Sequence, residues 1–419
     1  GGYGDPNSEF APDYASDQKL FGGEPASWAN IDKAWVDGKY HPELVGSYDW
    51  TSHGKQTGVT NEHTLSASGG TDKFKGYGSF GYLGQKGVQP GQKYQRYTLN
   101  TSFEANPVDP LRLGFTMNAS YGVQDYGYNY SKSVTGAGDY YSALNGMIPW
   151  TVPYDSDGKY IRNPWAYNVN IINPIDELRY NTNKRNDFRI NGSAYAQVDF
   201  GKVWAPLDGL SYRLQFGPEF QYYRLGIANA AEGINGDGNN VAQYNPSNKV
   251  AWTLDNLIYY NKTVADNHRI GITLLQSASK YHYENGNIKA NVASADELWW
   301  NTSSLSKPLQ YTTGLTETQL ASYMARINYT YADKYMLTAS VRSDGASQLA
   351  PGHKWASFPS VALGWRITEE EFMQKAAWVS NLKLRLGYGV SGNYAVSAYA
   401  TQGAVQSNVY TWGESTSMG

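Results

Sequence analysis

Alternation of apolar and polar residues is the dominant pattern along this chain. In the stretch LRLGFTMNASYGV, residues 111–123, every second residue from Leu111 is apolar or aromatic, and the residues between are Arg, Gly, Thr, Asn, Ser and Gly. Successive side chains of a β-strand point to opposite faces, so a period of two predicts a strand with one apolar and one polar face. The same alternation recurs in RYTLNTSFEA, DFRINGSAYAQVDF, SYMARINYTYAD and NLKLRLGYGV.

The pattern predicts about twelve antiparallel strands. Their expected ranges are 62–69, 75–84, 95–105, 110–122, 185–200, 210–225, 249–263, 268–283, 319–332, 335–343, 357–367 and 382–392. The expected connections alternate in length. Short links such as 70–74 and 333–334 are followed by long ones such as 123–184 and 284–318. One end of the sheet should therefore carry tight turns and the other long loops.

Strand length and loop asymmetry together favour a transmembrane β-barrel. A tilted strand needs about 9–11 residues to cross a bilayer, whereas strands of soluble proteins commonly have five or six. Outer-membrane barrels also combine short periplasmic turns, longer extracellular loops and aromatic girdles. Tyrosines gather near several predicted strand ends, for example at Tyr222, Tyr223, Tyr259 and Tyr260. A soluble β-sandwich or β-propeller with tyrosine-rich faces is the alternative, since alternation alone is a weak signal.

Composition narrows the function. The 419 residues include 36 Tyr, 13 Trp and 44 Gly, with only 17% charged residues, which fits many strands and turns. The net charge of -3 gives no electrostatic reason to expect nucleic-acid binding, and the absence of Cys excludes disulfides and thiolate metal sites. The longest apolar runs, such as NLIYY, are far shorter than the ~20 residues of a membrane helix.

Two long stretches resemble the SusC/RagA family of TonB-dependent outer-membrane transporters. They cover residues 48–122 and 334–393, and contain HTLSASGG, RSDGAS, WASFPSVALGWRI and GVSGN. The residues that carry the resemblance are Asp49, Trp50, His63, Gly69, Gly70, Arg96, Arg342, Asp344, Gly345, Trp355, Phe358, Pro359, Gly364, Trp365, Arg366, Gly392 and Asn393. Four also have a local interpretation: Gly69 and Gly70 in a hairpin turn, Pro359 at the start of a strand, and Gly364 leaving an inward-facing position empty so that plug or backbone can approach.

The resemblance implies an outer-membrane barrel of about 22 strands with a plugged lumen. Its implied function is TonB-driven import of oligosaccharides or peptides by a multi-pass protein of a Gram-negative bacterium. A SusD-like lipoprotein would cover the extracellular mouth, and the transporter–lid pair could form a homodimer. On this interpretation residues 1–61 are an extracellular region before the strands, 62–393 a barrel portion, and 394–419 the start of a further extracellular loop. The family's plug domain and TonB-contacting segment are not in this sequence.

Aromatic residues in the long predicted loops are the candidates for ligand contact. Tyrosine and tryptophan rings beside Asn, Asp and Arg can stack on sugar rings or grip a peptide, although such rings can equally pack the loops against each other or against the lid. The candidates are Tyr126, Tyr128, Tyr130, Trp150, Trp165, Trp299 and Trp300.

Catalytic and metal-binding patterns are sparse. The sequence shows no Ser-His-Asp arrangement, HExxH motif or phosphate loop, so we predict no enzyme activity and no cofactor. Calcium could bind the loops 154–160 (YDSDGKY) or 235–240 (NGDGNN), but both lack the closing bidentate Glu, and an Asp-Gly hairpin tip is the preferred interpretation. Two functions outside active transport stay open: a soluble or surface-bound β-rich glycan-binding module or hydrolase, and a passive porin.

Overall fold

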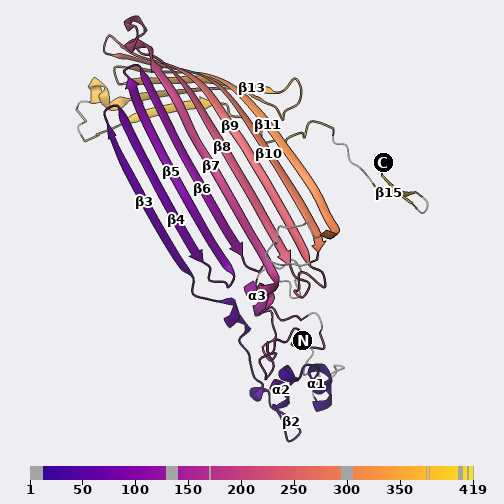
Figure 1. Ribbon diagram of the computed structural model, residues 1–419. Helices are drawn as coiled ribbons and strands as arrows, with labels where there is room; N and C mark the ends of the chain where they lie inside the picture. Colours follow the sequence, from indigo (N-terminus) through magenta and orange to yellow (C-terminus); the bar gives the residue numbers. More distant parts are fainter. Residues whose placement is uncertain are drawn as a thin grey trace.

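Each strand of the main sheet pairs with the strands that precede and follow it in the chain. The computed structural model describes residues 13–128, 140–168, 171–293, 305–373, 375–376, 378–403, 409–412 and 415–418. In this part of the chain, twelve antiparallel strands, β3 to β14, form one sheet in sequence order. The predicted all-β, antiparallel architecture of about twelve strands is confirmed. Figure 1 shows the long strands running side by side in one curved sheet.

The strands generally become longer from β3 to β11 and are shorter afterwards. Their bounds are β3 (Val59–Thr71), β4 (Phe74–Lys86), β5 (Gln92–Val108), β6 (Leu111–Tyr126), β7 (Asn181–Asp199), β8 (Leu210–Asn229), β9 (Val241–Val264), β10 (His268–Val292), β11 (Leu305–Tyr331), β12 (Tyr335–Ala346), β13 (Trp355–Arg366) and β14 (Lys383–Gly389). Two short hairpins, β1 (Trp35–Val36) with β2 (Lys39–Tyr40) and β15 (Val409–Trp412) with β16 (Ser415–Met418), lie outside this sheet.

The two ends of the sheet differ as the sequence predicts. At the turn end, residues 72–73, 109–110, 265–267 and 332–334 connect strands directly. The connections 200–209 and 367–382 contain 3-10 turns: η3 (Phe200–Lys202), η4 (Ala205–Leu207), η5 (Ile367–Glu369) and η6 (Glu371–Met373). The loop end carries the connections 87–91, 127–180, 230–240, 293–304 and 347–354. Figure 1 places α1 (Tyr14–Phe21), α2 (Pro25–Asp32) and α3 (Tyr140–Asn145) beyond the loop end.

Two turns at the turn end have the same backbone conformation. Ala265 and Asp266 have φ angles of 49° and 59°, and Ala332 and Asp333 have 49° and 57°. Two consecutive residues in the left-handed region give the type of turn whose twist matches that of the flanking strands. Arg269 joins the two turns through an ion pair with Asp333 at 2.8 Å. The ion pair therefore links the two neighbouring turns at this end of the sheet.

One face of the sheet is apolar and the other polar, and the apolar zone crosses the strands diagonally. On the apolar face, Phe220 of β8 pairs with Val250 of β9, which pairs with His282 of β10, and His282 pairs with Glu317 of β11. Going the other way from Phe220, the row continues through Ile190, Ala119, Leu99, Phe80 and Leu65. On strands tilted by about 35–45°, such a row leaves the apolar layer of the membrane after a few strands. The change from apolar residues to His282 and Glu317 along the row is therefore expected of a tilted barrel wall.

Strands β9 to β11 extend well beyond this zone. On β11 the apolar zone ends near Tyr323, which leaves 305–322 on the loop side, roughly 60 Å of strand at ~3.3 Å per residue. Three predicted strand boundaries are therefore wrong. Strand β9 begins at Val241 and not at 249, β10 ends at Val292 and not at 283, and β11 begins at Leu305 and not at 319. The predicted loops 226–248 and 284–318 shrink to 230–240 and 293–304.

Two local interpretations need correction. Gly69 and Gly70 lie within β3, and the turn itself is formed by Asp72 and Lys73; a Cβ on Gly70 would meet the Phe74 carbonyl at 2.4 Å. Pro359 is the fifth residue of β13, not its start. Its missing N–H does no harm there because β14 pairing ends at Ser360, one residue away.

No helix in the described part of the chain is long and apolar enough to cross a membrane.

Candidate functional site

A polar pocket of about 410 Å³ lies on the polar face near the loop end of β4 to β7. Its lining residues are Gln85, Tyr94, Arg96, Ser120, Gly122, Gln124, Arg185, Asp187 and Arg189. We call this set the arginine pocket. Three of its residues are arginines and one is an aspartate, so the pocket carries a net charge of +2 within a chain whose overall charge is -3.

Strand register brings these side chains together. Arg96 of β5 pairs with Gly122 of β6, and Gly122 pairs with Asp187 of β7. Paired residues on neighbouring strands point to the same face, and so do residues two positions away. Arg185 and Arg189 therefore flank Asp187 on the polar face, while Tyr94 flanks Arg96. Gly122 has no side chain, and the Tyr94 ring lies 3.5 Å from the position its Cβ would take.

The Asp187 carboxylate holds two guanidinium groups in place. Arg189 donates from Nε and Nη2 to Asp187 Oδ1 and Oδ2, both at 2.9 Å, and Arg185 donates from Nη2 to Oδ2 at 2.9 Å. Arg185 also donates to the Tyr126 hydroxyl at 3.2 Å and lies over the Tyr223 ring, 4.7 Å from its centroid. The geometry of Arg185 and Arg189 is thus fixed before any ligand arrives.

Arg96 differs from the other two arginines. Its side chain is exposed, and within the described residues no carboxylate forms an ion pair with it. A guanidinium group offers five N–H donors in one plane, and those of Arg96 face the pocket unpaired with any acid. The arrangement can bind an anion or a hydrogen-bond acceptor, but it contains no pair of facing carboxylates and no nucleophile with a base.

The segments beyond the loop end form their own small core. Trp50, Tyr128, Tyr140, Leu144 and Met147 are buried together, with Tyr48, Ile171, Ile175 and Leu178 packed against them. The Trp50 indole donates to the carbonyls of Ile148 and Thr151, both at 3.2 Å. Asp49 begins the 3-10 turn η2 (Trp50–Gly54) by accepting from the Thr51 N–H at 3.0 Å. The Asp49-Trp50 motif therefore attaches the segment before β3 to the β6–β7 connection.

The Glu177 carboxyl is also buried in this region. Glu177, in α4 (Glu177–Tyr180), is 1% exposed and accepts from the Ile234 N–H at 2.9 Å. Burial raises the pKa of the Glu177 carboxyl above its usual range. The contact joins the β6–β7 connection to the β8–β9 connection.

The predicted aromatic candidates for ligand contact have different surroundings in the structure. Tyr126 supports the arginine pocket through Arg185, whereas Tyr128 is 2% exposed and packs in the loop-end core. Trp150 lies between Phe21 and Trp165, with ring centroids 4.8 Å and 5.9 Å away, and the Trp165 indole donates to the Leu20 carbonyl. Tyr130, Trp299 and Trp300 lie outside the described residues. Their roles in ligand contact stay predictions.

Most of the motif residues make contacts within the sheet or beside it. Arg342 binds Asp344 at 2.7 Å and Ser322 at 3.0 Å on the polar face. Gly345 and Gly392 leave room for aromatic rings, since a Cβ there would meet Trp355 at 2.5 Å and Phe358 at 2.2 Å. The remaining contacts are His63 stacked on Tyr82, Arg366 near Glu369, and Asn393 accepting from the Ala395 N–H.

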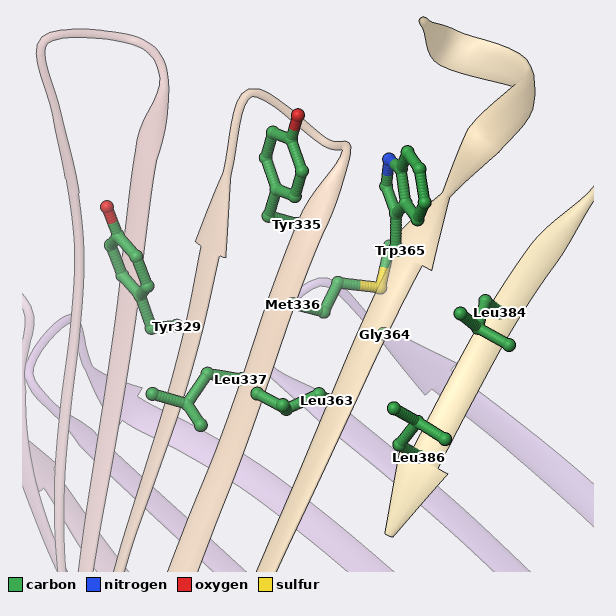
Figure 2. A pocket seen from close by; sticks show the side chains of 9 residues that line it. All are labelled: Tyr329, Tyr335, Met336, Leu337, Leu363, Gly364, Trp365, Leu384 and Leu386. Carbon is green, nitrogen blue, oxygen red and sulfur yellow. The ribbon is translucent and has the colours of Figure 1, made fainter.

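An apolar groove of about 490 Å³ lies on the opposite face at the turn end. Figure 2 shows Tyr329, Tyr335, Trp365 and four leucines of β12 to β14 around it. The Trp365 indole and the Tyr335 hydroxyl both donate to Glu370, at 2.9 and 2.6 Å. Gly364, expected to leave space on the polar face, has Met336 3.4 Å from the position of its Cβ. Rings with an apolar body and a hydrogen-bonded polar tip suit a membrane interface.

The two loops with a calcium-like pattern form ordinary turns. Asp155 accepts from the backbone N–H groups of Asp157 and Lys159 at 3.0 and 2.8 Å, and Gly158 has φ of 76°. Asp237 and Gly238 both have positive φ. In the described part of the chain no group of three or more His, Asp or Glu residues is placed to hold a metal ion.

Sequence reasoning missed most of the arginine pocket. Only Arg96 stands among the predicted motif residues, while Tyr94, Arg185, Asp187 and Arg189 have no motif to mark them. A signal was nevertheless present in RNDFR, residues 185–189, where three charged residues at alternate positions of a strand must share one face.

Comparison with known proteins gives consistent matches. The chain is 31% identical over 350 residues to "TonB-dependent receptor P39" of Formosa agariphila, covering 82% of this chain and 32% of that protein. It is 25% identical to "TonB-dependent receptor SusC" of Bacteroides thetaiotaomicron, covering 89% of this chain and 37% of that protein. No family model matches the chain. The chain thus spans about a third of the length of these relatives.

A solved structure with the same fold is that of the RagAB peptide importer in its open-open state. The TM-score is 0.76 at 20% identity, and the match covers 97% of this chain and 44% of that one. This likeness confirms the barrel wall, and its partial coverage of the solved chain agrees with the predicted portion of a larger barrel. These relatives are named receptors, which supports the prediction that the chain is not an enzyme.

Proposed function

The chain belongs to the SusC/RagA family of TonB-dependent outer-membrane receptors, and from that premise we propose that it forms part of an active importer of oligosaccharides or peptides. The chain lies in the outer membrane of a Gram-negative bacterium as a set of membrane-spanning strands. Energy for import comes from the inner membrane through TonB. The cycle consists of ligand capture at the loop end and passage along the polar face, with no covalent step.

The observation that carries this proposal is the division of one sheet into an apolar face and a charged, hydrogen-bonded polar face. Hydrocarbon cannot satisfy guanidinium or carboxylate groups, so the face with Arg96, Asp187 and Arg342 must meet water, ligand or protein. The opposite face exposes large side chains such as Leu65, 77% exposed, in rows across many strands. A soluble monomer rarely exposes an apolar surface of that extent, which argues against a soluble binding module or hydrolase.

A SusD-like lipoprotein over the loop end is the proposed partner. The loop end presents the helices α1 and α2, and exposed tyrosines that include Tyr14, Tyr141 and Tyr167. Strands β9 to β11 extend toward the same end beyond the apolar zone, so a lid would meet their ends together with these exposed tyrosines. Aromatic residues are enriched in protein interfaces of this kind. A homodimer of the transporter–lid pair is part of the same proposal.

The experiment is a depletion assay on living cells. A strain that lacks the gene, and the same strain carrying it on a plasmid, receive a mixture of oligosaccharides and a tryptic digest, and mass spectrometry follows what leaves the medium. We expect a defined set of compounds to be consumed only by the complemented strain, and only while TonB is present. Equal depletion without the gene contradicts the proposal, and depletion that persists without TonB indicates a passive porin.

A further inference from the structure

We propose that the arginine pocket binds a carboxylate group carried by the imported ligand. The inference rests on the proposed function, and it adds the chemical class of the cargo. The pocket holds Arg96, Arg185 and Arg189 against the single carboxylate of Asp187. Two positive charges are left over in a hollow of about 410 Å³ on the polar face, near the end through which a ligand enters.

The pocket is built before the ligand arrives. Arg185 and Arg189 are fixed by Asp187, whose side chain is only 16% exposed, and Arg185 is also fixed by Tyr126 and by the Tyr223 ring. A preformed site avoids the entropy of ordering long side chains on binding. Arg189 is still 55% exposed and Arg96 is exposed, so both guanidinium groups are accessible from the lumen.

The geometry of the donors suits a carboxylate. A guanidinium group binds a carboxylate through two parallel N–H···O bonds, and such charge-assisted bonds are about twice as strong as neutral ones. Arg96 has no acid among the described residues, so its full set of donors is available to the ligand. This distinguishes Arg96 from Arg342 of the same face, which is already paired with Asp344.

The Tyr94 ring adds a second contact. It stands beside Arg96 on β5, over the backbone of Gly122, and it lines the same pocket. A flat ring next to a cation can accept the apolar face of a ligand whose carboxylate sits on the arginine. An acidic sugar and an acidic amino acid both offer this combination, so the shared chemistry is the carboxylate and the experiment separates the two sources.

The test uses the natural polypeptide that contains this chain, purified in detergent, and isothermal titration calorimetry. The probes are trigalacturonate and triglutamate, with maltotriose and triglutamine as neutral probes of matched size. We expect one acidic probe to bind and its neutral counterpart to bind at least tenfold more weakly. Arg96→Gln should then weaken the acidic probe roughly 10- to 100-fold, the effect of losing hydrogen bonds to a charged group.

Arg326→Gln is the matched control. Arg326 is also an exposed arginine, and it lies on β11, two positions from Asn328 and away from the pocket. Its substitution changes the net charge equally and should leave the affinity unchanged. An equal loss of affinity for the acidic probe in both variants would mean that only the overall charge of the lumen matters. That result would overturn the assignment of the arginine pocket as the binding site.

A carboxylate from elsewhere in the same protein is the competing occupant. In that case Arg96→Gln lowers the unfolding midpoint of the ligand-free protein, and neither acidic probe binds; this result overturns the inference. Because Arg96 has no ion pair among the described residues, we expect its variant to unfold at the midpoint of the unchanged protein. TonB-dependent depletion of neutral compounds alone also overturns the inference but leaves the proposed function standing.

Discussion

Placing one charge on the apolar face of β11 is a direct perturbation of the barrel wall. Ile327 pairs with Ile272 and Ala339 on that face and lies midway between Tyr323 and Tyr331. The eight residue steps from Tyr323 to Tyr331 span roughly 26 Å of strand at ~3.3 Å per residue, or about 20 Å across the membrane at the usual tilt, which fits within the ~25 Å apolar band of such barrels. Ile327 is therefore near the middle of the membrane.

Ile327→Arg should lower the free energy of unfolding by about 2–4 kcal/mol, the cost of arginine at the midplane of a barrel wall. This corresponds to a decrease of roughly 30- to 900-fold in the folding equilibrium constant. The assay is urea unfolding of the protein in phospholipid vesicles, followed by tryptophan fluorescence. The control is Asn328→Arg, which places the same charge on the polar face one residue away and loses only an exposed hydrogen bond to Thr338.

For the control we expect a loss of at most about 1 kcal/mol, the value of one ordinary hydrogen bond. The reasoning fails if the two variants are destabilised equally, because then both faces have the same surroundings. It also fails if Asn328→Arg is the more damaging change, because then the polar face is the buried one.

Three further predictions concern the remaining parts of the chain. Asn256 accepts a hydrogen bond from Tyr212 and donates one to Gln276 on the apolar face. Asn256→Leu should lower the free energy of unfolding by about 1–3 kcal/mol in the same urea assay, and adding Gln276→Leu should recover part of that loss. Trp50→Ala should destabilise the loop-end core by about 3–5 kcal/mol and expose residues 140–175 to protease, whereas Trp378→Ala, at an 88% exposed position, should change neither. Burial raises the Glu177 pKa, so its contribution to stability is complete below the ordinary carboxyl pKa and decreases as pH rises through the raised value. The hydrogen-exchange protection factors of 230–240, which are corrected for the intrinsic pH dependence of exchange, should therefore be lower at pH 8 than at pH 5, and Glu177→Gln should remove that difference.

The strand number, the order of the strands and the division into two faces could be predicted because the membrane imposes them locally. Each residue of LRLGFTMNASYGV meets either hydrocarbon or the lumen, so apolar and polar residues alternate directly along the sequence. Strand ends could not be predicted on β9 to β11. In QYNPSNK, residues 243–249, both faces meet water, the alternation disappears, and pairing continues only because the neighbouring strands continue.

The arginine pocket and the loop-end core were harder to predict for a different reason. Arg96 and Asp187 are 91 positions apart in sequence, and they meet only because each pairs with Gly122. Trp50 is buried by a segment about a hundred residues later, so its hydrophobicity alone does not separate a core role from a ligand-binding one. The aromatic candidates illustrate this, since Tyr128 packs in that core while Tyr126 supports the pocket.

Adjacent single cysteines give the most direct measurement of which face meets lipid. The chain has no cysteine of its own, so Phe115→Cys and Thr116→Cys can each carry one fluorescent label, on the apolar and the polar face of β6. In vesicles that contain a nitroxide-labelled lipid, we predict strong quenching of the label at position 115 and little at position 116, with the reverse order for a water-soluble quencher. A label at position 115 that neither quencher reaches would place the apolar rows in a closed protein interior and contradict the account.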